Sequence, residues 1–196
     1  MLILAAPFAR AAERPILVLG DSLSAAYHID ADAGWVALLA QRLKANHSPI
    51  AVVNASISGE TTAGGLARLP ALLTQHKPSV VVVELGANDG LRGLPLEQIR
   101  NNLDAIIKTS RDANAKVVLL GIELPVNYGP QYRVGLRDMY RDAAKEFNVP
   151  LVPFLLDGVA LDPKLMQEDG LHPLAAGEPK VLDNVWPAIA AVIGVN

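Results

Sequence analysis

The chain has 196 residues, of which 51% are hydrophobic and 19% are charged, and its formal net charge at pH 7 is −3. This length suits one domain with a sizeable core, and the composition excludes an intrinsically disordered chain. The scattered Lys and Arg residues form no basic cluster for nucleic acid, and the absence of cysteine excludes disulfides, thiolate catalysis and cysteine metal sites.

The N-terminal segment 1–11 resembles a short or truncated secretory signal. In "MLILAAPFARAAERP" an apolar stretch precedes Ala9-Arg10-Ala11, which matches an A-x-A cleavage site, although no basic residue comes before the stretch. We therefore expect a periplasmic or secreted protein with one domain over 12–196. An ordinary N-terminal strand or a wrongly chosen start codon is the alternative. No later run reaches the ~20 apolar residues that cross a bilayer, so no membrane anchor is expected.

Five short apolar runs predict the strands of a parallel sheet. They are rich in Val and do not alternate with polar residues, as expected for strands covered on both faces. The runs are 16–20, 50–57, 79–86, 116–124 and 149–156.

Segments with the 3.6-residue period of amphipathic helices lie between and after these runs. Their apolar faces are marked by Trp35, Leu38, Leu39 and Leu43; Leu66, Leu69 and Leu73; Ile99, Leu103, Ile106 and Ile107; Leu136, Tyr140, Ala144 and Phe147; and Leu182, Val185, Trp186, Ile189 and Ile193. Pro187 is expected to bend the last helix or to lie near a break. The alternation of strands and helices predicts the α/β class, as a three-layer α/β/α sandwich with a five-stranded parallel sheet.

Polar clusters follow the predicted strands and are expected to meet at one edge of the sheet. "GDSLSAAY" covers residues 20–27, "NASISGET" 54–61, "GANDG" 86–90 and "DGLHP" 169–173. In an open α/β sheet the ligand crevice lies beyond the carboxyl ends of the strands. This position favours a functional site over four unrelated turns.

The residue types in these clusters suit acyl transfer, which needs a nucleophile, a base, a group that orients the base, and donors for an oxyanion. Ser22 supplies a hydroxyl at the predicted start of a helix, and His172 can accept its proton. Asp169 can hold the other ring nitrogen, although it could instead cap the final helix. The backbone N–H groups of Ser22 and Gly59 and the side-chain N–H of Asn88 can donate to the oxyanion.

Single residues of this set also have plain structural interpretations. Asn88 could form an Asx-turn and Gly59 could be a turn glycine, but the complementary chemistry of the set favours a hydrolase. His28 has only Asp30 as a nearby carboxylate, so His172 is the favoured base. No two histidines stand at ligand spacing, and neither a metal nor a cofactor is expected.

Together the four ordered clusters resemble the SGNH hydrolases, also called GDSL esterases. The letters of the family name match Ser22, Gly59, Asn88 and His172, and Asp169 matches its D-x-x-H acid. The similarity runs from about residue 15 to the C-terminus and is closest to the bacterial thioesterase I, lysophospholipase L1 and arylesterase branch. It implies a flavodoxin-like topology, serine hydrolysis of carboxylic esters and thioesters, a small-molecule ester or lipid substrate, no cofactor and usually a periplasmic location. Ala87 departs from the glycine common in this branch, and its methyl is expected to tighten the wall near Asn88.

Two short loops, 89–95 and 124–132, are expected to wall the crevice, because no insertion is large enough for a lid. The predicted substrate-binding residues are Leu91, Leu94, Leu124, Pro125 and Tyr128, accompanied by Val126 and Tyr132. Such an apolar lining favours aryl esters and short to medium acyl chains. One alternative is a carbohydrate acetylesterase on the same fold, which should have aromatic or polar sugar-binding loops. Another is a non-catalytic acyl- or lipid-binding protein, which would not need Asp169 and His172 together.

Overall fold

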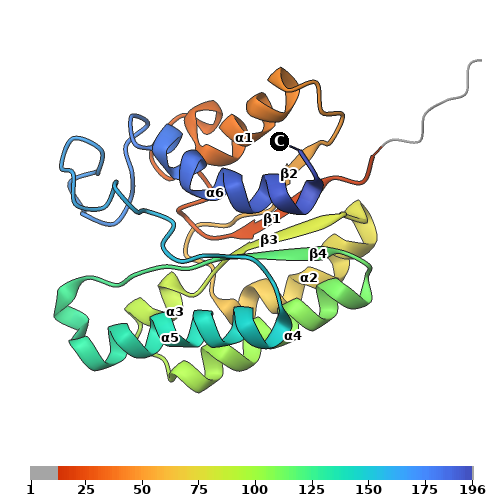
Figure 1. Cartoon of the computed structure of the whole chain (residues 1–196). Coiled ribbons are helices and arrows are strands. Elements are labelled where there is room, and N and C mark those ends of the chain that lie inside the picture. Colours follow the sequence, from red (N-terminus) through yellow and green to blue (C-terminus); the bar gives the residue numbers. More distant parts are fainter. Residues whose placement is uncertain (1–12, 196) are drawn as a thin grey trace, which may run out of the picture.

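Five parallel strands form one sheet in the order β2-β1-β3-β4-β5 in the computed structural model, which describes residues 13–195 (Figure 1). The strands are β1 (Ile16–Gly20), β2 (Val52–Asn54), β3 (Val80–Glu84), β4 (Lys116–Leu120) and β5 (Leu151–Val152). The prediction of an α/β protein with a five-stranded parallel sheet is confirmed.

Helices cover both faces of the sheet. The helices are α1 (Trp35–Ala45), α2 (Thr62–His76), α3 (Ala87–Leu91), α4 (Leu96–Asp112), α5 (Pro130–Phe147) and α6 (Glu178–Ile193), with short 3-10 helices η1 (Ala31–Ala33) and η2 (Val126–Tyr128). Helices α1 and α6 lie on one face, and α2, α4 and α5 lie on the other, as Figure 1 shows. This is the predicted three-layer arrangement.

The two hydrophobic cores take alternate residues of each central strand. Leu17 and Leu19 of β1 pack in the core beneath α2, α4 and α5, whereas Ile16 and Val18 pack beneath α1 and α6. All four side chains are fully buried. Since both faces of the strand are covered, an apolar side chain is favoured at every position, which explains the continuous apolar runs.

The edge strands are shorter than the runs 50–57 and 149–156 predicted. Pro153 follows β5 directly, and because proline has no N–H it cannot donate to a sheet ladder. The chain after β2 nevertheless stays beside β1, since the backbone N–H of Ile57 donates to the carbonyl of Gly20 at 3.1 Å. The loop that contains Gly59 is thereby held next to the carboxyl end of β1.

Helix α6 runs through Pro187 without the break that the sequence suggested. Its first residue, Glu178, is only 2% exposed and accepts a hydrogen bond from the backbone N–H of Trp35 at 2.8 Å. Burial raises the pKa of Glu178 to about 7, although the Trp35 N–H opposes the rise. This contact joins the first turns of α1 and α6 on one face of the sheet.

The segment 1–11, interpreted above as a secretory signal, lies outside the described residues. Over residues 13–195, none of the helices has the length and apolar character needed to cross a membrane.

Candidate active site

Ser22 lies two residues beyond Gly20, the last residue of β1. A Cβ on Gly20 would stand 2.8 Å from the side chains of both Ser24 and Ser56, so glycine allows the chain to enter the tight turn. The helix expected to start at Ser22 is absent, because residues 22–28 form turns. The turn nevertheless places the Ser22 hydroxyl in a cavity at the carboxyl edge of the sheet.

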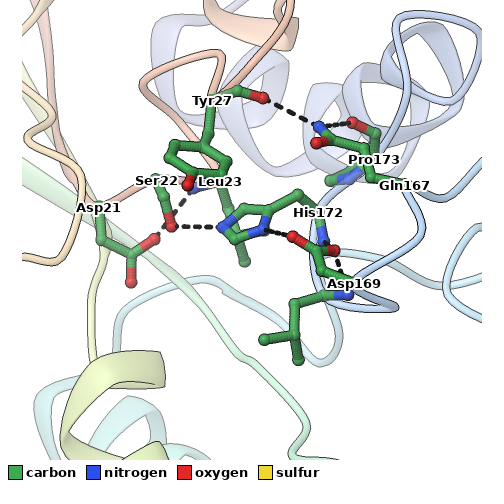
Figure 2. Close-up of polar contacts among 9 residues, drawn as sticks. Asp21, Ser22, Leu23, Tyr27, Gln167, Asp169, His172 and Pro173 are labelled. Atoms are coloured by element: carbon green, nitrogen blue, oxygen red, sulfur yellow. Dashed lines mark hydrogen bonds and ion pairs between the residues drawn. The ribbon is translucent and has the colours of Figure 1, made fainter.

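A continuous chain of polar contacts joins Ser22, His172 and Asp169 (Figure 2). The Oγ atom of Ser22 is 2.8 Å from Nε2 of His172, and Nδ1 of His172 is 2.7 Å from Oδ2 of Asp169. With its proton on Nδ1, the imidazole donates to the carboxylate and leaves Nε2 free to accept the serine proton. The structure thus brings together the three residues that the sequence singled out.

Asp169 is fixed by its own loop. Its Oδ1 atom accepts hydrogen bonds from the backbone N–H groups of Leu171 at 2.9 Å and His172 at 3.0 Å. Burial alone would raise the pKa of Asp169, but these two N–H groups and the His172 ring outweigh burial and lower the pKa. Asp169 is therefore ionised at neutral pH and aimed at the imidazole. It does not cap the final helix, which begins nine residues later at Glu178.

Two residues that the sequence interpretation missed support the histidine. The Nε2 atom of Gln167 donates to the carbonyls of Tyr27 at 2.9 Å and Pro173 at 2.8 Å, and its backbone N–H donates to the carbonyl of His172 (Figure 2). The ring of Tyr27 packs against the His172 ring with centroids 4.4 Å apart. His28 stacks on Tyr27 and is exposed. These contacts tie the histidine loop to the serine turn.

The candidate oxyanion donors follow β2 and β3. Gly59 has a φ of +81°, which favours glycine, and no atom lies within 4 Å of the position a Cβ would take. Asn88 is the second residue of α3 and lines the same cavity as Ser22. Its Nδ2 atom donates to Oδ2 of Asp21 at 3.0 Å.

An apolar cavity of about 90 Å³ adjoins Ser22 and His172. Three of the predicted substrate-binding residues line it, namely Leu91, Leu124 and Pro125. Leu94 and Tyr128 pack against the hydrophobic core and are not among the residues that line this cavity, so substrate binding by these two stays a prediction. The Tyr128 hydroxyl donates to the carbonyl of Leu91 at 2.9 Å and so joins the two loops. The lining also includes Ala87, which the sequence placed in the wall near Asn88. Residues that the sequence interpretation had not assigned complete it: Leu23, Ile122, Glu123, Phe154, Leu156 and Leu171.

A second cavity, of about 320 Å³, continues from the first. The two share lining residues, among them Leu124, Phe154 and Leu171. Arg133 of α5 fixes the shared wall, because its Nε donates to the carbonyl of Leu124 at 2.7 Å and its guanidinium pairs with Glu123 at 3.5 Å. The Ser22 cavity therefore opens into a longer apolar groove.

Comparison with known proteins agrees with this geometry. The family model of the GDSL-like lipases/acylhydrolases matches residues 18–178, a span that includes the serine, the histidine and the aspartate of the site. The chain belongs to the GDSL-like lipase/acylhydrolase family.

Two curated relatives are similar to the chain over most of their length. Esterase TesA of Pseudomonas aeruginosa is 50% identical over 184 residues, 94% of this chain and 92% of the relative. Thioesterase 1/protease 1/lysophospholipase L1 of Escherichia coli is 49% identical over 181 residues, 92% of this chain and 85% of the relative. Among solved structures, the psychrotrophic esterase EstA from Pseudoalteromonas sp., inhibited by monoethylphosphonate, matches with a TM-score of 0.88 and 42% identity, covering 93% of this chain and all of that one. The protein is accordingly a hydrolase of ester bonds.

In this GDSL-like acylhydrolase, α3 also anchors the loop that carries Gly59. The fully buried carboxylate of Asp89 accepts hydrogen bonds from the backbone N–H of Thr62 at 2.9 Å and from its hydroxyl at 2.6 Å. Thr62 begins α2, three residues after Gly59. Asn88 and Asp89 thus connect two of the polar loops. Within the described residues, no group of three or more His, Asp or Glu side chains could hold a metal ion.

Proposed function

We propose that the protein is a serine esterase in which Ser22 attacks the ester carbonyl and forms an acyl-enzyme. The observation that supports this most is the unbroken contact chain from Ser22 through His172 to Asp169, at 2.8 and 2.7 Å. A serine hydroxyl becomes an effective nucleophile when an imidazole of fixed tautomer can take its proton, and a carboxylate on the other ring nitrogen fixes that tautomer.

In the acylation step, Nε2 of His172 takes the proton of Ser22 as Oγ bonds to the carbonyl carbon. The carbonyl oxygen gains the negative charge, and we assign its donors as the backbone N–H groups of Ser22 and Gly59 and the Nδ2 amide of Asn88. His172 then gives its proton to the leaving alcohol or thiol while the C–O or C–S bond breaks.

Deacylation repeats these transfers with water. His172 removes a proton from water as the water oxygen adds to the acyl carbon, and the same donors stabilise the second oxyanion. When the intermediate collapses, the proton returns to Ser22 Oγ and the carboxylic acid leaves. Asp169 stabilises the imidazolium in both steps because its carboxylate is ionised at neutral pH.

The apolar groove supports a substrate with an aryl or alkyl acyl group. An acyl chain that fills the first cavity can continue past Leu124, Phe154 and Leu171 into the second. The relatives include an esterase and a thioesterase/lysophospholipase by name. We therefore extend the proposal to aryl esters, short and medium acyl esters, acyl thioesters and lysophospholipids.

Export to the periplasm or the medium is also part of the proposal. It is supported by the apolar stretch and the Ala9-Arg10-Ala11 motif of the sequence. An enzyme at that location would meet lipids and esters outside the cytoplasm.

Covalent labelling tests the nucleophile directly. A fluorophosphonate should add once per native chain, and peptide mass spectrometry should place the label on Ser22, because only an activated serine attacks the phosphorus. Heat-unfolded protein, in which the contact between Ser22 and His172 is lost, should not react. A label on another residue, or none on the native protein, would overturn the proposal.

The groove also predicts broad chain-length tolerance. Across nitrophenyl esters from acetate to palmitate, kcat/KM should vary gradually, because an open apolar wall discriminates by only about 1–3 kcal/mol per methylene and less where the wall can move. The exposed end of the groove supports this expectation, since Val126 is 79% exposed and Leu161 is 99% exposed. A sharp optimum, with neighbouring esters slower by orders of magnitude, would indicate a closed pocket instead.

A further inference from the structure

The amide of Asn88 is held from behind by a buried carboxyl group. Its Nδ2 atom donates to Oδ2 of Asp21 at 3.0 Å, and the same side chain lines the cavity next to Ser22. An amide nitrogen has two N–H groups. One is used by Asp21, and the other remains for a ligand in the cavity.

Asp21 uses both of its oxygens as acceptors. Oδ2 receives the Asn88 amide, and Oδ1 receives the backbone N–H of Leu23 at 3.0 Å. The side chain is fully buried. One carboxyl group therefore fastens both the turn that holds Ser22 and the helix that holds Asn88. In Figure 2, Ser22 lies between the Asp21 carboxyl and the His172 ring.

Because two N–H groups point at the side chain of residue 21, this side chain must offer two acceptor atoms and no donor. An asparagine at position 21 would turn its own NH₂ toward either Leu23 or Asn88, leaving two donors facing each other. A protonated Asp21 has the same problem, because the oxygen that carries the proton becomes a donor and faces the N–H of Leu23 or Asn88. Only the carboxylate satisfies both N–H groups at once.

We propose that Asp21 is a positioning residue of the reaction, whose carboxylate aims the free N–H of Asn88 at the substrate's carbonyl oxygen. This inference rests on the proposed function, in which Asn88 is an oxyanion donor. Oxyanion donors are effective because they are oriented before charge develops. The contact with Asp21 supplies that orientation in the absence of substrate.

Asp21 lies beside a second buried carboxyl group, Glu84, and the two differ in how readily they carry a negative charge. Glu84, at the end of β3, is fully buried beside it and accepts hydrogen bonds from the backbone N–H of Asp21 at 3.2 Å and the Ser24 hydroxyl at 2.8 Å. Burial raises the pKa of Glu84 well above its usual range, and the nearby charge of Asp21 raises it further. This rise favours the neutral form of Glu84 and leaves the negative charge of the pair chiefly on Asp21, the carboxyl that binds Asn88.

Burial also raises the pKa of Asp21 to about 6, although hydrogen bonds from Leu23, Glu84 and Asn88 oppose the rise. Besides Glu84, the titratable groups that act on the Asp21 charge are His172 of the 169–173 loop and Tyr140 of α5. Above about pH 6 the Asp21 carboxylate can accept from both donors. Below that pH it loses one acceptor, and Asn88 loses its fixed direction.

A double-mutant cycle tests the inference. Asn88→Ala should lower kcat on a nitrophenyl ester by ~10²-fold or more, with a smaller change in KM, as expected for an oxyanion donor. Asp21→Asn should lower kcat by about tenfold or more in the wild-type background but by less than about threefold in the Asn88→Ala background, because its effect passes through Asn88. Equal losses in the two backgrounds would overturn the positioning role.

A matched control replaces another buried carboxyl. Glu178→Gln makes the same carboxyl-to-amide exchange at a residue that is 2% exposed and bonded to Trp35 on the α1 and α6 face. Its kcat should match the wild type, because glutamine keeps the oxygen that accepts from Trp35. The midpoint of thermal unfolding for each variant separates lost folding from lost positioning.

A second measurement does not need the Asp21 variant to fold. The ratio of wild-type kcat to Asn88→Ala kcat should be ~10² near pH 8 and should fall severalfold as the pH drops through about 6, because protonated Asp21 no longer aims the amide. A ratio that stays constant with pH would overturn the inference. If instead Asn88→Ala left kcat unchanged at every pH, the proposed oxyanion donor itself would be wrong.

Discussion

Ser22→Ala is expected to lower kcat/KM for ester hydrolysis by ~10⁶-fold, the scale of loss seen when a serine of this kind of triad is removed. The variant loses the only atom that can form the acyl-enzyme in the proposed mechanism. It should remain folded, because the hydroxyl contacts His172 at the cavity surface and contributes no core packing. Activity on a nitrophenyl ester and the midpoint of thermal unfolding measure the two effects.

Ser56→Ala is the matched control for this variant. Ser56 lies close to Gly20 at the same edge of the sheet, but its hydroxyl is buried without a hydrogen-bond partner among the described residues. Removing it should leave kcat/KM close to the wild-type value. Near-normal turnover by Ser22→Ala would contradict the mechanism.

His172→Ala is expected to cause a loss of similar size, ~10⁶-fold in kcat, because the base and the nucleophile act as one unit. His28→Ala should change kcat by no more than about threefold, since His28 is exposed and reaches His172 only through the ring of Tyr27. Steady-state kinetics of the two purified variants on the same ester provide the comparison.

The wild-type pH profile complements these variants. Its rate should rise with pH as the imidazole loses its proton and becomes able to act as a base. His28→Ala should keep this rise. Equal losses of activity in the two histidine variants would mean that the base has been assigned to the wrong residue.

The central strands could be predicted from sequence because burial on both faces leaves a continuous apolar run. The 16–20 run became β1 with the bounds expected, whereas the 149–156 run contains only the two residues of β5. An apolar run in the sequence predicts that its residues are buried, but it does not predict which of them form the hydrogen bonds of a sheet. Leu155 and Leu156 are as buried as the residues of a central strand, yet they lie in turns that follow Pro153.

The site was predictable to the extent that its residues follow strands. Ser22, Asn88 and His172 stand in short polar clusters after apolar runs, and the shared edge of a parallel sheet gathers such clusters. Glu84 does not stand in such a polar cluster, because it is the last residue of strand β3. Its place beside Asp21 follows from the register that pairs Gly20 with Glu84, which only the folded sheet defines.

Loop residues were the least predictable part of the site. Gln167 carries no periodicity and no motif, yet it fastens the histidine loop to Tyr27 and Pro173. Tyr128 looked like part of the substrate wall, but its hydroxyl turns to the carbonyl of Leu91. Hydrogen bonds between a side chain and a distant carbonyl decide such cases, and they leave no pattern in the sequence.

The separation of 150 residues between Ser22 and His172 affects when the protein becomes active during folding. Each strand pairs with one that precedes it in the chain, so the sheet can grow outward from β1. The serine is in place early in this order, whereas its base emerges after all five strands, followed by the helix that covers Trp35. A chain that lacks residue 172 therefore holds the hydroxyl without the imidazole, so ester hydrolysis must wait until the fold is nearly assembled.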